Sequence, residues 1–183
     1  MKPLFTIHGG EYLVGSYIEQ QFKRVNLWVP SRDTGIDLLV TDRRNRRAVS
    51  LQVKFGKDWL VTDMKREFQE PLRACGWWTI NRDKLRASTA DFWVFVLLGS
   101  KSRTPDFVII PPAELQKRLT SIHSTKKKMI HSYIWVTEHK RCWETRGLPV
   151  ESQLQIAYGK YQDASRDFKK WLNNWAPVSH LNR

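Results

Sequence analysis

Asp37, Gln52 and Lys54 are side chains that can hold a divalent cation and act on an anionic substrate. Hard cations such as Mg²⁺ prefer oxygen ligands, which the Asp37 carboxylate, the Gln52 amide and the backbone carbonyl of Val53 can supply. A bound divalent metal polarises a phosphate and generates hydroxide, as phosphodiester hydrolysis requires. The Lys54 ammonium can orient or activate the attacking water, or stabilise the charge that develops on the phosphate.

An antiparallel hairpin is expected to bring these side chains together. Residues 36–40 and residues 48–55 are typical of two strands, joined by a charged turn. In the second strand apolar and polar residues alternate, so Gln52 and Lys54 share one face. Asp37 stands at the start of the first strand, beside that face.

A helix over residues 9–24 precedes the hairpin, because its apolar residues recur at helical spacing. Glu11, near its start, can add a carboxylate to the same site. Glu19, about two turns further along, is the alternative helix carboxylate, although its position is more typical of a surface charge.

The remaining pattern alternates between strands and helices. Strands are expected at 25–29, 77–80, 92–98, 107–110 and 132–136, and helices near 64–68, at 113–119 and at 160–175. The last helix is indicated by an i, i+3, i+4, i+7 stripe of Phe168, Trp171, Leu172 and Trp175. The chain is therefore expected to be an α/β protein.

The chain is strongly basic, with 31 Lys and Arg against 18 Asp and Glu and a net charge of +13. A polyanion is the expected partner, since neutralised phosphates release condensed counterions. Candidate nucleic-acid contacts are the arginines of the hairpin turn and a lysine run further on: Arg43, Arg44, Arg46, Arg47, Lys126, Lys127 and Lys128. Arginine forks suit phosphate oxygens, but such runs are also typical of solvated turns. Charge alone does not separate DNA from RNA.

Two adjacent tryptophans, Trp77 and Trp78, lie in one predicted strand. Since successive side chains point to opposite faces, one ring faces inward and one outward. The outward ring can stack on a base or pack beneath a second layer of structure.

Residues 1–183 are expected to form one domain, with a C-terminal helical extension over about 150–183. The sequence has no apolar run long enough for a membrane-spanning helix and no signal-peptide pattern at its start. A cytoplasmic protein is therefore expected, with Cys75 and Cys142 as reduced thiols.

The order of these motifs resembles the PD-(D/E)XK, or restriction-endonuclease-like, nuclease superfamily. The resemblance covers residues 9–55: a helix opening on Gly10 and Glu11, then Asp37, a hairpin, and Gln52-Val53-Lys54. The usual pattern has Asp or Glu where this chain has Gln52. Similar Gln-x-Lys forms occur in the Mrr-like branch.

The resemblance implies a restriction-endonuclease-like core, with a central mixed β-sheet flanked by helices. It further implies a DNA endonuclease that uses Mg²⁺ or Mn²⁺, in restriction, defence or DNA processing. Glu11, Asp37, Gln52 and Lys54 would be its catalytic residues, and a homodimer would suit cleavage of both strands. The alternative is a catalytically weak or inactive DNA-binding or assembly module, because the neutral Gln52 is a weaker metal ligand than a carboxylate.

Overall fold

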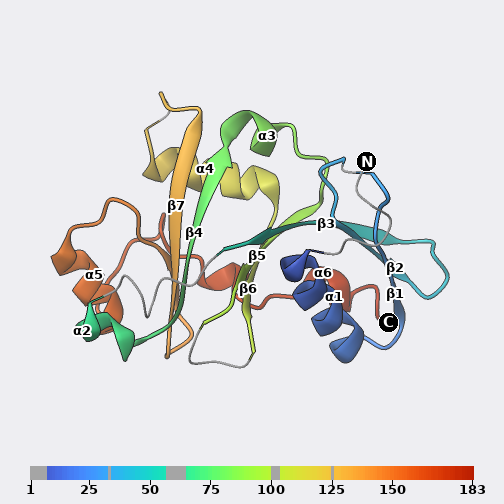
Figure 1. The fold of residues 1–183 in the computed structure, drawn as a ribbon, viewed down its shortest axis with the longest axis horizontal. Helices are drawn as coiled ribbons and strands as arrows, with labels where there is room; N and C mark the ends of the chain where they lie inside the picture. Colours follow the sequence, from blue (N-terminus) through green and yellow to red (C-terminus); the bar gives the residue numbers. More distant parts are fainter. Residues whose placement is uncertain (1–7, 33, 57–64, 100–103, 125) are drawn as a thin grey trace.

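The computed structural model describes residues 8–32, 34–56, 65–99, 104–124 and 126–183. The chain is a mixed α/β protein with a central mixed sheet flanked by helices (Figure 1). Five strands form this sheet, in the order β1 (Val25–Trp28), β2 (Leu38–Asp42), β3 (Ala48–Phe55), β5 (Phe92–Leu97) and β6 (Asp106–Ile110). The β3–β5 pair is parallel and its neighbours are antiparallel, which makes the sheet mixed.

The predicted hairpin is present as β2 and β3, with Leu38 opposite Leu51 and Thr41 opposite Ala48. Its first strand begins at Leu38, two residues later than position 36, for a reason that lies in the side chain of Asp37 (below). In β3 the alternation is as expected, since Leu51 is fully buried on one face while Gln52 and Lys54 lie on the other.

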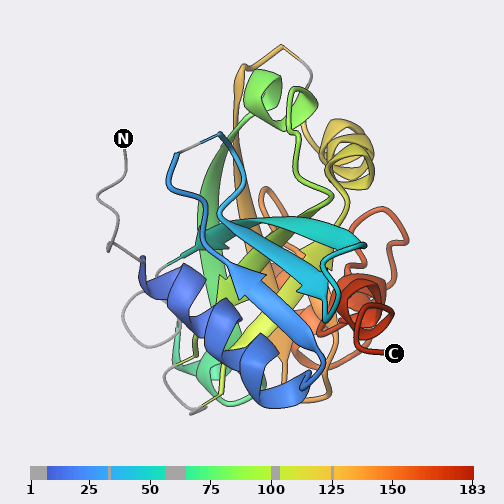
Figure 2. The same ribbon diagram turned by 90° about the vertical axis from the view of Figure 1, so that its right-hand side faces the viewer.

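Two helices cover one face of this sheet. Helix α1 (Gly9–Gln21) lies across β3 and β1 (Figure 2), and α6 (Ala176–Ser179) lies beside it (Figure 1). The Trp175 ring, at the start of α6, stacks on Tyr17 of α1 at 5.1 Å between centroids and meets Phe107 of β6 at 5.2 Å. Helix α1 and the C-terminal segment are thereby joined over one apolar core.

A second sheet packs against the opposite face. It is antiparallel and contains β4 (Leu72–Asn81), β7 (Met129–Thr137) and β8 (Cys142–Glu144). Trp78 points inward from β4 and meets Phe95 of β5 at 5.0 Å, whereas Trp77 is 40% exposed. Helices α3 (Arg82–Arg86) and α4 (Pro112–Ile122) close this core, while α2 (Arg66–Gln69) and α5 (Val150–Ala157) flank the second sheet (Figure 1).

The prediction of a helix over residues 160–175 is wrong. That stretch holds only a short 3-10 turn, η1 (Lys169–Trp171), although Phe168, Trp171 and Trp175 are buried as their spacing indicated. The carbonyls of residues 164, 165 and 167 accept hydrogen bonds from Arg118 Nη1 at 2.8–2.9 Å, so they are turned away from a helical ladder.

Asn173 fixes the end of the same stretch along β6. Its backbone has a φ of +51°, and its N–H donates to the Phe107 carbonyl at 2.6 Å. Its side-chain oxygen accepts the N–H of Phe107 at 2.8 Å, and its amide donates to Asp106 Oδ1 at 2.8 Å. The segment therefore follows the edge of the sheet and does not form a continuous helix.

In the part of the chain that the structure describes, no helix is both long and apolar enough to cross a membrane.

Candidate metal and phosphate site

Asp37 marks the point where the two strands of the hairpin stop pairing. Its backbone N–H donates to the Leu51 carbonyl at 2.8 Å, and its carboxylate Oδ2 accepts the N–H of Val53 at 2.7 Å. The side chain thus replaces the next rung of the backbone ladder, which is why β2 begins at Leu38. The carboxylate is thereby held against β3 at the residue between Gln52 and Lys54.

The start of α1 lies across the same end of β3, and Gly10 permits this close approach. A Cβ atom at Gly10 would stand 2.6 Å from Phe55 Cβ and 3.3 Å from a methyl group of Val53. The next residue, Glu11, is only 4% exposed, and its Oε2 accepts the N–H of His8 at 3.3 Å. Glu11 therefore stabilises the end of the helix as well as placing a carboxylate near β3.

One depression of about 250 Å³ is lined by residues from α1, from the start of the hairpin and from β3. It brings together all four side chains that the sequence selected as catalytic: Glu11, Asp37, Gln52 and Lys54. Val53, whose carbonyl was the remaining candidate ligand, lines it too. Glu19 does not, since it is exposed on α1 and lines a different hollow with β1.

Lys54 rests on an aromatic ring that the sequence analysis did not select. Its Nζ lies 4.8 Å from the centre of the Trp93 ring, which is 3% exposed. Trp93 is held in turn by a hydrogen bond from its Nε1 to Ser88 Oγ at 2.9 Å. A cation over an aromatic face is attracted by the ring quadrupole, so Trp93 limits where the ammonium can lie. This contact depends on the parallel pairing of β3 with β5, which no local pattern predicts.

The residues that line the depression carry oxygen atoms of the kind that Mg²⁺ and Mn²⁺ take as ligands: two carboxylates, one amide and the backbone carbonyl of Val53. Within the described residues, no three His, Cys, Asp or Glu side chains gather closely enough to hold a metal ion by themselves. Gln52 and the Val53 carbonyl are the further oxygen ligands that could stand beside Glu11 and Asp37.

The basic residues selected from the sequence lie elsewhere. Arg43, Arg44, Arg46 and Arg47 are exposed at the far end of the hairpin and line a separate hollow. The lysine run precedes β7 beside the second sheet, where Lys128 pairs with Asp83 at 3.2 Å and the carbonyl of Lys127 accepts a hydrogen bond from Arg82. Neither group lines the depression.

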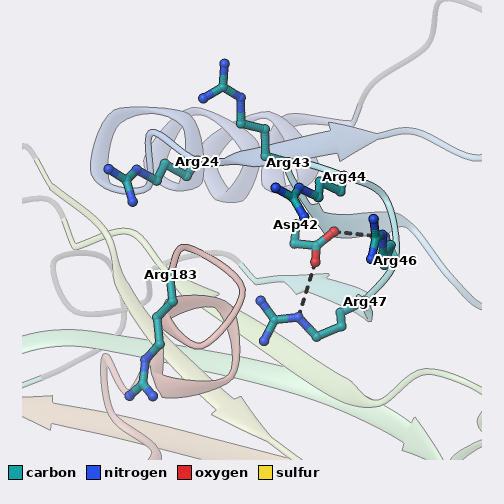
Figure 3. A pocket seen from close by; sticks show the side chains of 7 residues that line it. All are labelled: Arg24, Asp42, Arg43, Arg44, Arg46, Arg47 and Arg183. Atoms are coloured by element: carbon teal, nitrogen blue, oxygen red, sulfur yellow. Dashed lines mark hydrogen bonds and ion pairs between the residues drawn. The ribbon is translucent and has the colours of Figure 1, made fainter.

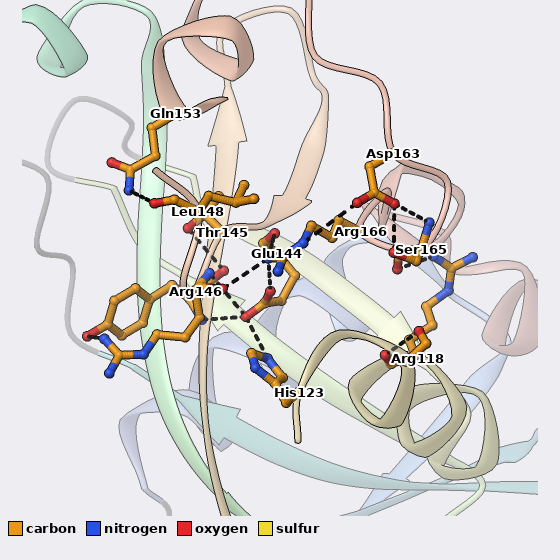
Figure 4. Close-up of polar contacts among 12 residues, drawn as sticks. Arg118, His123, Glu144, Thr145, Arg146, Leu148, Gln153, Asp163, Ser165 and Arg166 are labelled. Atoms are coloured by element: carbon orange, nitrogen blue, oxygen red, sulfur yellow. Dashed lines mark hydrogen bonds and ion pairs between the residues drawn. The ribbon is translucent and has the colours of Figure 1, made fainter. Parts of the chain in front are cut away.

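A second cluster of ionisable side chains surrounds Glu144, which is fully buried in β8 (Figure 4). Its carboxylate accepts hydrogen bonds from Arg166 Nη1 at 2.8 Å and from the backbone N–H groups of Tyr133 and Arg146 at 3.3 Å, and it lies 3.1 Å from His123 Nε2. A buried carboxylate with this many partners is satisfied within the protein. The cluster joins α4, β8 and the C-terminal segment, and we assign it a structural role.

No protein-family model matches this chain, and neither does any curated protein or any solved structure. Any inference about function therefore rests on the residues around the depression.

Proposed function

We propose that the chain is a metal-dependent DNA endonuclease with a restriction-endonuclease-like core, and that the depression beside β3 is its active site. The observation that carries this proposal is the anchoring of Asp37 on the N–H of Val53. It fixes a carboxylate between Gln52 and Lys54, with Glu11 lining the same depression.

Each residue has a role that its chemistry supports. Asp37, Gln52, Glu11 and the Val53 carbonyl would hold Mg²⁺ or Mn²⁺. When bound, such an ion polarises the phosphate and lowers the pKa of a water molecule. Lys54, held over Trp93, would bind a non-bridging oxygen of the scissile phosphate and orient the attacking water.

The basic surface supports a nucleic-acid substrate. The net charge of +13 is large for 183 residues, and its phosphate-neutralising cations would contribute most of the non-specific affinity. In this proposal, the four hairpin arginines and the lysines before β7 contact the DNA backbone. A comparison of duplex DNA with structured RNA in a binding assay tests the choice of substrate, and tighter binding of RNA would contradict it.

A second candidate function rests on Gln52. A neutral amide binds Mg²⁺ less strongly than a carboxylate does, so the same site can serve a DNA-binding module with weak or absent cleavage. This candidate predicts tight DNA binding with no cleavage under any divalent metal.

The deciding experiment is nicking of supercoiled plasmid with Mg²⁺ or Mn²⁺. We expect cleavage by the wild type, at least a hundredfold loss in Lys54→Ala on the scale of a lost charge-stabilising group, and no loss in Lys117→Ala, an exposed lysine of α4. We expect Gln52→Glu to lower the metal concentration needed for half-maximal cleavage. Cleavage that survives Lys54→Ala would refute the assignment of the active site.

A further inference from the structure

Six arginines line a hollow of about 490 Å³ at the hairpin turn (Figure 3). Four belong to the turn itself, and two come from other parts of the chain: Arg24, Arg43, Arg44, Arg46, Arg47 and Arg183. Asp42 is the one acidic residue among its lining. The sequence pointed only to the four neighbouring arginines, because the other two meet them through the fold.

The turn that carries four of them is fixed by its own hydrogen bonds. Asp42 Oδ1 accepts the N–H of Arg46 at 2.8 Å, and its Oδ2 accepts Nε of Arg47 at 3.2 Å. Asn45 takes a φ of +55° and accepts hydrogen bonds from Asn26 Nδ2 and Thr41 Oγ1 at 2.9 and 2.6 Å. The arginine backbones are therefore held in place before any ligand arrives.

The other two arginines are brought in by a contact between the end of α1 and the C-terminal segment. The N–H of Arg24 donates to Asn182 Oδ1 at 2.8 Å, and Leu181 is 4% exposed in the core beneath α1. Arg183 is thus placed opposite the turn. Three separate segments converge on one hollow.

The positive charge of the hollow favours the binding of an anion. Like charges gathered on a concave surface repel one another and concentrate counterions, and Asp42 is already engaged by Arg46 and Arg47. Guanidinium groups bind phosphate oxygens through paired N–H donors. Each arginine has five such donors, so six exceed what one phosphate can use, and consecutive phosphates of a strand fit the hollow better.

The hollow and the depression lie at opposite ends of the same two elements. Along β3, Arg47 precedes Gln52 and Lys54 by five and seven residues, which is about 17–23 Å at the rise of a strand. Helix α1 spans the same interval, since its 13 residues measure about 20 Å. One DNA strand advances about 3.4 Å per nucleotide along the duplex axis, so the interval corresponds to about five to seven nucleotides.

We propose that this arginine hollow binds backbone phosphates of the nucleic-acid substrate about five to seven nucleotides from the phosphate held beside Lys54. The inference rests on the proposed function for that distance and for the choice of nucleic acid. It adds Arg24 and Arg183 as binding residues. It also predicts that a productive substrate extends from the cleavage site toward the hairpin turn.

The test is binding of labelled duplex DNA in EDTA, where metal-dependent cleavage does not interfere. The double variant Arg24→Ala/Arg183→Ala leaves the hairpin intact, and the backbone contact to Asn182 does not use either side chain. Its control is Lys117→Ala/Lys160→Ala, which removes two exposed charges outside the hollow. We expect the slope of log affinity against log salt to fall by about 1.8 in the first variant, or about 0.9 per lost phosphate contact, and to change little in the control.

Equal affinities and salt slopes in the two double variants would overturn the inference. So would a result in which tripolyphosphate binds the wild type but not Arg24→Ala/Arg183→Ala while duplex affinity is unchanged, because the occupant would then be a small polyphosphate. Failure of the nuclease proposal is distinguishable: the plasmid would stay intact with every metal while the binding defect of the double variant persisted.

Discussion

Gly10 offers the sharpest test of how the depression is built. In Gly10→Ala the new Cβ would stand 2.6 Å from Phe55 Cβ, whereas ordinary contacts begin near 3.4 Å. The start of α1 must therefore move away from β3 by about 1 Å, since the backbone of Phe55 is fixed in the sheet. Gly9→Ala is the matched control, because among the described residues its Cβ would meet only Phe55 Cε1, at 3.9 Å.

The expected magnitudes follow from two opposing effects. Forcing a carbon into a packed interface costs about 1–3 kcal/mol, while replacing a helical glycine by alanine gains up to about 1 kcal/mol. Gly10→Ala should lower the free energy of unfolding by about 1–2 kcal/mol, and Gly9→Ala should leave it unchanged or raise it slightly. Because a displacement near 1 Å can cost a hundredfold in rate, Gly10→Ala should also lose metal-dependent cleavage by about that factor.

Urea unfolding followed by tryptophan fluorescence measures the first effect, and plasmid nicking at saturating metal measures the second. Equal stabilities for the two variants, or a more stable Gly10→Ala, would refute the close packing of α1 on β3. A destabilised Gly10→Ala with undiminished cleavage would show instead that Glu11 need not be placed by this contact.

Three further predictions concern ionisable groups outside the depression. Glu144→Gln should lower the free energy of unfolding by about 3–5 kcal/mol. The reason is that Arg166, 13% exposed, loses its nearest carboxylate at 2.8 Å and keeps only Asp163 at 3.7 Å. A loss under 1 kcal/mol in urea unfolding would contradict this. Burial raises the pKa of the Cys142 thiol well above its ordinary value. In the folded protein Cys142 should therefore resist the thiol reagent DTNB at pH 8 and react only in denaturant. Rapid labelling of a folded Cys75→Ser variant, in which Cys142 is the remaining thiol, would contradict this prediction. The hydrogen bond from the N–H of Arg46, together with the contact to Arg47, lowers the pKa of Asp42. The ionised Asp42 carboxylate therefore stabilises the folded state fully above about pH 4, and this contribution is lost as the pH falls through the folded-state pKa. The free energy of unfolding of Asp42→Asn should vary less with pH below 4 than that of the wild type, and parallel pH dependences for the two proteins would refute the assignment.

Local patterns predicted the elements that position the depression. The alternation in β3 placed Gln52 and Lys54 on one face, and helical spacing located α1 and its Glu11. These features depend on residues close together in sequence, where periodicity is informative. The start of β2 was less accurate, because the side chain of Asp37 takes a hydrogen bond that a strand would have given to the backbone.

The features that the sequence did not predict depend on distant contacts. Trp93 lies beneath Lys54 only because β3 and β5 pair in parallel across more than thirty residues. The second sheet was recognised only in fragments, since β4 begins at Leu72, well before the tryptophan pair that indicated it. The stripe in residues 168–175 correctly predicted burial but not helix, because Arg118 takes the carbonyls that a helix would use.

The hydrogen bonds of Asn173 to β6 also have a consequence for association between chains. An edge strand with open N–H and C=O groups is a template for pairing with another chain. On β6 the backbone and side chain of Asn173 occupy both polar groups of Phe107, and Leu172 forms a bridge with Val108. In the described part of the chain the other edge is β1, a strand of four residues with Trp28 half exposed. Growth of the central sheet by an added strand, in a dimer or in an aggregate, would therefore begin at β1, and a proline or lysine placed there would suppress it.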